Sequence, residues 1–99
     1  MTNYAEQSAP VTRENAGYII QKAEPVPVHP SDRPCEIVLG FRPSTPGCCP
    51  FVVWTCYGHD DYNFGHYFKN QEQAEEFFWK KVKEEKRTRR ECGWTYIKT

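Results

Sequence analysis

Residues 50–68 read PFVVWTCYGHDDYNFGHYF, a pattern typical of two aromatic-rich strands joined by a short polar turn. Successive side chains of a strand point to opposite faces of the sheet. Apolar side chains occur in both directions here: Phe51, Val53 and Tyr57 point one way, and Val52, Trp54 and Cys56 point the other. Both faces of this strand pair therefore need to be covered.

Two more strands are expected before this pair. Tyr18–Ala23 is the first, and the closely spaced prolines that follow it cannot continue a central strand because they lack an N–H. Cys35–Arg42 is the second, and a turn-rich segment, 43–50, leads from it into Phe51–Tyr57. Asn63–Phe68 is the fourth strand.

The pairing of the last two strands depends on the length of the turn at Gly58–Asp61. A five-residue turn places Trp54 beside His66, whereas a four-residue turn places Val53 beside His66. A shift of one residue exchanges the face that every side chain occupies. Both registers remain open from the sequence.

A helix is expected to begin after Asn70, which caps it, with Gln73 as the return half of a capping box. Apolar residues then share one side at helical spacing: Ala74, Phe77, Phe78 and Val82. The following KEEKRTRRE has no apolar anchor, so the last turns either project from the domain or fray, and Gly93 ends the helix. Trp94–Ile97 either adds a terminal strand or packs loosely.

These elements predict an α+β domain: an antiparallel sheet of three or four strands, in sequence order, with one C-terminal helix packed on one face. Residues 17–99 form this single domain, and residues 1–16, polar and without periodicity, form a flexible N-terminal arm. Because one helix covers one face of the sheet, the other face is left for a partner, a second copy of the chain or a ligand.

The chain of 99 residues carries 13 Lys and Arg against 13 Asp and Glu, so its overall charge favours neither nucleic acid nor a membrane surface. No apolar run is long enough to span a membrane, and the N-terminus lacks the pattern of a secretory signal. Five cysteines, an odd number, fit reduced thiols better than a disulfide framework. We therefore expect a cytoplasmic protein that does not contact a membrane.

Cysteine and histidine residues offer a possible zinc site: Cys56, His59 and His66, with Cys48 and Cys49 upstream. The sequence has no paired Cys-x2-Cys knuckle, however, and adjacent cysteines do not readily chelate one ion. The spacing of the Cys and His residues also matches no motif of a Cys–His nucleophile, and the sequence has no Gly-rich phosphate loop. We therefore expect no metal, no cofactor and no enzymatic activity.

The preferred hypothesis is a small non-enzymatic protein-binding module of the adaptor or inhibitor type. Aromatic anchors and a polar rim form its expected binding surface: Trp54, Tyr57, Tyr67 and Trp79, with His59, Asp60, Asp61 and His66. Trp79 lies off the apolar side of the helix, so its indole is expected to be exposed. The partner is another protein or a second copy of this chain.

The alternative is a nucleic-acid-associated protein. Residues 80–90 contain seven basic residues against Glu84 and Glu85, a local excess of positive charge on a neutral chain. The candidate phosphate contacts are Lys80, Lys83, Lys86, Arg87, Arg89 and Arg90. Exposed aromatic side chains of the sheet would stack on bases.

Overall fold

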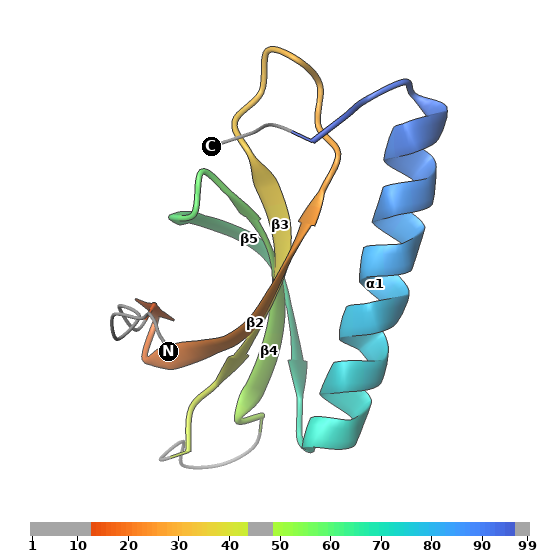
Figure 1. The fold of residues 1–99 in the computed structure, drawn as a ribbon. Helices are drawn as coiled ribbons and strands as arrows, with labels where there is room; N and C mark the ends of the chain where they lie inside the picture. The colour runs from red at the N-terminus through yellow and green to blue at the C-terminus, as the bar shows by residue number, and fades with distance from the viewer. Residues whose placement is uncertain (1–12, 44–48, 97–99) are drawn as a thin grey trace, which may run out of the picture.

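A computed structural model describes residues 13–43 and 49–96. The elements follow one another as five strands and a helix: β1 (Glu14–Asn15), β2 (Tyr18–Val26), β3 (Cys35–Phe41), β4 (Phe51–Tyr57), β5 (Asp61–Phe68) and α1 (Gln71–Glu91). The strands form one antiparallel sheet in the order β1-β2-β3-β4-β5, and α1 packs on one face (Figure 1). The predicted α+β class and the C-terminal helix are confirmed.

The expected strand number of three or four is wrong by the additional short strand β1. Glu14 pairs with Ile19 and Asn15 pairs with Tyr18. Two residues are too few to show the alternation by which a strand is recognised in a sequence. Residues 13–16, which we expected in the flexible arm, therefore belong to the sheet and its first turn, whereas residues 1–12 lie outside the described part of the chain.

β2 continues past Ala23, where we expected it to stop, through Pro25 to Val26. Only Tyr18 and Ile19 of β2 pair with β1, so in the described structure the rest of β2 is an edge of the sheet. A proline is tolerated at an edge because its missing N–H breaks no ladder on the open side.

The helix begins as predicted. The Asn70 side chain accepts a hydrogen bond of 2.9 Å from the Gln73 N–H, and Gly93 follows the helix end with φ of 78°. Its last turns do pack on the domain, through Arg89, whose guanidinium donates to the Pro27 carbonyl at 3.0 Å and to the Tyr57 hydroxyl at 3.2 Å. Beyond the helix, Thr95 forms an isolated bridge with Val28, and no longer terminal strand forms within residues 94–96.

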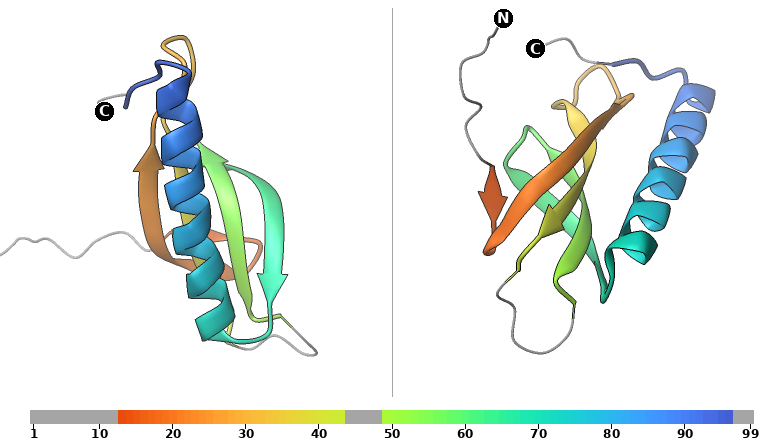
Figure 2. Two further views of the ribbon diagram at one scale, coloured as in Figure 1. Left: turned by 90° about the vertical axis from the view of Figure 1, so that its right-hand side faces the viewer. Right: turned by 60° about the horizontal axis from the view of Figure 1, so that its bottom comes forward.

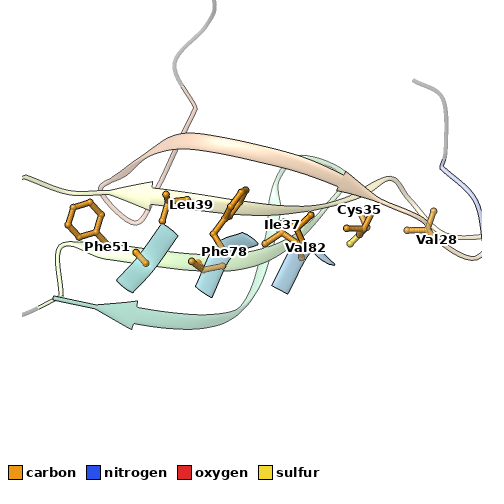
Figure 3. Packing of buried hydrophobic residues seen from close by; sticks show 10 residues of the cluster. Val28, Cys35, Ile37, Leu39, Phe51, Phe78 and Val82 are labelled. Atoms are coloured by element: carbon orange, nitrogen blue, oxygen red, sulfur yellow. The ribbon is translucent and has the colours of Figure 1, made fainter. Parts of the chain in front are cut away.

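The main core lies between α1 and the sheet, and Figure 2 shows α1 lying along the strands. It is built from apolar side chains that face one another across this layer: Val26, Val28, Cys35, Ile37, Leu39, Phe51, Val53, Ala74, Phe78 and Val82. Figure 3 shows Phe78 and Val82 of α1 gathered with Ile37 and Leu39 of β3. The predicted apolar side of the helix is thus its buried side.

A second core lies on the opposite face of the sheet. It consists of Tyr18, Val38, Val52, Trp54 and Cys56. The sheet curls so that β1 and the turn between β4 and β5 reach around the side away from α1 (Figure 1). The chain therefore covers much of its own second face, which we had expected to lie open.

Candidate protein-binding surface on β5

The hairpin of β4 and β5 contains a bulge that changes its register. Near the turn Tyr57 pairs with Asp61, and the loop is only residues 58–60. Farther along, Val53 pairs with His66, so Trp54 alone lies opposite both Phe64 and Gly65. The five-residue turn is therefore wrong, and the pairing of the four-residue turn holds only beyond the bulge.

The size of Trp54 explains why the bulge occurs here. Its indole lies against two glycines on the neighbouring strands, and a Cβ at Gly65 would come within 2.9 Å of the Trp54 Nε1 atom. A Cβ at Gly40 would lie 3.3 Å from the same ring. Glycine in a strand often marks such a close approach. Trp54 is consequently only 5% exposed and contacts the rings of Tyr18 and Tyr62 edge to face.

The bulge places Phe64 in an unusual position. Its φ is 56°, in the left-handed region that a bulky side chain rarely adopts, and its side chain is 74% exposed. The ring makes no stacking contact with another aromatic ring in the described part of the chain. Phe64 is therefore displayed to solvent rather than packed.

Other aromatic side chains flank Phe64 along this edge strand. Tyr67, paired with Val52 on the second face, is 54% exposed. His66 lies on the α1 face, where its ring centroid is 4.7 Å from that of Phe77. An open hollow of about 480 Å³ continues from there, lined by Phe68, Gln73, Glu76, Phe77 and Lys80. We call Phe64, His66, Tyr67 and Phe77 the β5 surface.

Three of the four expected anchors do not lie on this surface, the first being the buried Trp54. Tyr57 is half-buried beneath the end of α1, where its hydroxyl accepts from Arg89. Trp79 is 49% exposed, but it lies toward β2, with the Lys22 ammonium 5.9 Å from its ring centroid. Since β2 and β5 are at opposite sides of the sheet, Trp79 does not share a surface with Phe64.

The expected polar rim is occupied by internal contacts. Arg33 binds Asp61 at 2.8 Å and Asp60 at 3.8 Å, and His59 Nδ1 lies 2.8 Å from Glu36 Oε2. Glu36 is 7% exposed and faces the second side of the sheet. These contacts hold the turn between β4 and β5 against the rest of the sheet.

Arg13 completes this cluster from the N-terminal segment. Its guanidinium donates to Glu36 at 3.0 Å and to the Tyr62 hydroxyl at 3.0 Å. Burial by itself would lower the pKa of Arg13, but the hydrogen bonds with Tyr62 and Glu36 outweigh it and raise that pKa. Arg13 thereby neutralises a buried carboxylate on the face that lacks a helix.

The cysteine and histidine candidates are separated by the fold. Cys56 is fully buried on the second face, whereas His66 packs on the α1 face. Burial raises the pKa of the Cys56 thiol, the opposite of what an activated nucleophile needs. Within residues 13–43 and 49–96, no three His, Cys, Asp or Glu side chains are placed to hold a metal ion. Cys48 lies outside the described residues.

The basic residues of the helix are divided between two roles. Arg89 is buried, and the Lys86 ammonium lies 3.4 Å from the Glu24 carboxylate, so both hold the helix to the sheet. Lys80, Lys83, Arg87 and Arg90 are exposed.

Comparison with protein-family models, with curated proteins and with solved structures finds no match to this chain. Fold and surface together define a small α+β domain with a curled antiparallel sheet and an aromatic edge strand. None of the helices in the described ranges has the length and apolar character to cross a bilayer. Phe64 was not among the expected anchors, although one of the two registers placed it with Trp54 and His66 on the second face; the adjacent Gly65 inside an aromatic strand is a further sequence signal.

Proposed function

We propose that this protein is a non-enzymatic protein-binding module that inserts Phe64 into an apolar pocket of a partner protein. Tyr67, on the second face, and His66, on the α1 face, lie close to Phe64 along the same strand. The adaptor or inhibitor type of module suits this arrangement, because a single protruding aromatic side chain on a hairpin can fill a partner's pocket.

The display of Phe64 is the observation that supports the proposal. A residue in a sparsely populated backbone region costs about 1–3 kcal/mol. A Phe ring left in water also lacks the stabilisation of about 1.5–3 kcal/mol that its burial would provide. Phe64 incurs both costs, at 74% exposure and a φ of 56°. Strain of this kind clusters at binding and catalytic sites.

A different protein suits the β5 surface better than a second copy of the chain. Two copies would associate most simply by pairing their β5 edges, which requires regular strands. A bulge interrupts the ladder and is one of the devices that prevents edge-to-edge pairing. The bulge at Phe64 and Gly65 lies in the middle of β5. The partner therefore meets the side chains of β5 rather than its backbone.

A photo-cross-linking experiment tests this assignment. Phe64 is replaced by photoreactive benzoyl-phenylalanine in the full-length protein, which is then irradiated in extract of the source cells. Tyr96, another exposed aromatic residue, carries the same group in the control. We expect one protein to be cross-linked from position 64 and not from position 96. Excess unlabelled wild-type protein should abolish this product, and excess Phe64→Gly should not.

Two outcomes would overturn the proposal. A product with the mass of two chains would identify a second copy as the occupant. Equal competition by wild type and Phe64→Gly would show that the Phe64 ring contributes nothing to the contact. A circular dichroism melt of Phe64→Gly, matching or exceeding that of wild type, excludes unfolding as the cause of lost competition.

A further inference from the structure

The outer side of α1 carries cations that pair with no carboxylate among the described residues, although the Arg90 guanidinium donates to the Tyr96 hydroxyl at 3.4 Å. Three of the basic residues in this segment are neutralised by carboxylates: Lys81 with Glu85 at 3.3 Å, Arg89 with Glu85 at 2.8 Å, and Lys86 with Glu24 at 3.4 Å. Among the residues that the structure describes, Lys80, Lys83, Arg87 and Arg90 form no ion pair. We call these four residues the basic stripe.

The spacing of the basic stripe places its members on one side of the helix. Residues three or four apart are neighbours on a helix surface, and the four positions follow this interval. Lys80 and Arg90 are ten residues apart, which corresponds to about 15 Å along the axis at roughly 1.5 Å per residue. A row of four cations over this length favours a polyanionic ligand.

The stripe has an aromatic flank and an acidic flank. At about 100° per residue, Trp79 lies on one side of it and Glu84 and Glu91 lie on the other. The Trp79 indole is 49% exposed, one turn before Lys83, and the Lys22 ammonium lies 5.9 Å from its ring centroid. A polyanion is thus favoured along the Trp79 side, where an indole is available for stacking.

The stripe is also held in place. Arg89 and Lys86 bind the last turns of α1 to Pro27, Tyr57 and Glu24. The cations therefore project from a fixed helix, which lowers the entropic cost of binding a ligand.

We propose that the basic stripe and Trp79 bind single-stranded nucleic acid, with the cations on phosphates and the indole stacked on a base. Proteins that bind single strands without sequence preference combine cations that contact the backbone with aromatic side chains on which bases stack. Apart from Lys80, which lines the hollow beside Phe77, this site is distinct from the β5 surface, and it does not depend on the function proposed for that surface.

Fluorescence anisotropy with a labelled mixed-sequence 20-mer tests the proposal on the full-length chain, at protein concentrations up to about 100 µM. Four phosphate contacts predict a slope of about −3 for log affinity against log salt, or roughly fifty-fold weaker binding at 200 mM than at 50 mM. Lys83→Gln/Arg87→Gln should reduce the slope to about −1.4. The matched control, Lys69→Gln/Lys81→Gln, removes the same charge from two lysines outside the stripe and should leave the slope unchanged.

A second pair of variants tests the stacking. Trp79→Leu should weaken binding about tenfold with no change in the salt slope, since it removes no cation. Tyr67→Leu, which removes an exposed aromatic residue of the β5 surface, and Phe64→Gly should leave the affinity unchanged.

Three results would overturn the proposal. If the labelled 20-mer does not bind at 50 mM salt, the proposal is wrong. Equal competition by polyglutamate of similar length would assign the stripe to an acidic protein instead. The same 20-mer annealed to its complement is the last comparison. If it binds as tightly as the single strand and Trp79→Leu does not weaken binding, stacking on an unpaired base plays no part.

Discussion

The two faces of the sheet are closed by different means. The face under α1 is covered by a separate element, whose Phe78 and Val82 fill the space over Ile37 and Leu39. The second face is covered by the sheet's own curl, with Trp54 lying against Gly40 and Gly65. Large side chains from a helix cover one face. On the other face a single indole covers the strands, and it fits because the two residues beside it are glycines.

This difference shows how a short chain with a single helix satisfies an apolar pattern on both sides of a strand. The second face still requires a charge pair, Arg13 with Glu36, where a helix would have supplied apolar atoms. Both faces are largely occupied, and within residues 13–43 and 49–96 the β5 edge and the outer side of α1 carry the exposed aromatic and cationic side chains considered for function.

Phe78→Ala should have the largest effect, because it removes a fully buried ring from the face under the helix. We expect the free energy of unfolding to fall by about 4 kcal/mol. Urea denaturation followed by circular dichroism measures this loss, and Phe77→Ala, on a half-buried ring one position earlier, should cost clearly less. Equal losses for the two variants would show that Phe78 is no better packed than the half-buried Phe77.

Arg89→Met tests whether the last turns of α1 depend on the guanidinium. The substitution leaves the Pro27 carbonyl and the Tyr57 hydroxyl without their donor and should cost about 2–3 kcal/mol. Arg87→Met, two residues away and exposed, should change stability by less than about 0.5 kcal/mol. Hydrogen exchange of residues 83–91 should accelerate only in the Arg89 variant.

Gly65→Ala tests the close approach on the second face. The new Cβ would lie 2.9 Å from Trp54 Nε1, and we expect a loss of about 2 kcal/mol from overpacking. In a Trp54→Phe background the smaller ring should reduce that loss by more than about 0.5 kcal/mol. Additive effects of the two substitutions would show that the bulk of Trp54 is not the reason for the bulge.

Phe64→Gly should change stability in the opposite direction. Glycine adopts positive φ without the penalty of a side chain, so the free energy of unfolding should rise by up to about 1 kcal/mol. Phe64→Ala keeps a Cβ and should gain less. A loss comparable to that of a core substitution would show that the ring packs against the domain.

The smallest effect concerns acid stability through Glu85. Burial by itself would raise the pKa of Glu85, but hydrogen bonds and charges from Arg89 and Lys81 lower it below its ordinary value. A carboxyl whose pKa is depressed on folding contributes stability above its unfolded pKa of about 4.3, and this is lost as pH falls through the folded value. Wild type should therefore lose more stability than Glu85→Gln below about pH 4, measured by urea midpoints. Parallel pH curves would contradict this role.

Local patterns were sufficient to predict much of the fold. Asn70 and the spacing of Ala74, Phe78 and Val82 located the helix and its buried side, because capping and helical periodicity are short-range properties. Short runs rich in β-branched and aromatic residues, bounded by turn formers, located β3 and β4. β1 was missed because two residues carry no period, and the end of β2 was misplaced because Pro25 is acceptable only at an edge.

The candidate sites were harder to predict because exposure depends on contacts between distant segments. Trp54 looked like a surface anchor until Gly40 and Gly65, far from it in sequence, were brought beside its ring. Arg89 looked like one of several similar cations, yet only Arg89 reaches Pro27 and Tyr57. Phe64 became prominent through a bulge that neither simple register contains.

The sequence by itself determined the α+β class, the helix with its cap, and the fact that the strand Phe51–Tyr57 is apolar on both faces. Those properties follow from propensity and periodicity within a few residues. Only the tertiary structure decided that the sheet curls over its second face, that Trp54 is buried while Phe64 is exposed, and which cations of α1 remain unpaired. These outcomes depend on steric fit and charge pairing between strands and helix, which no local pattern records.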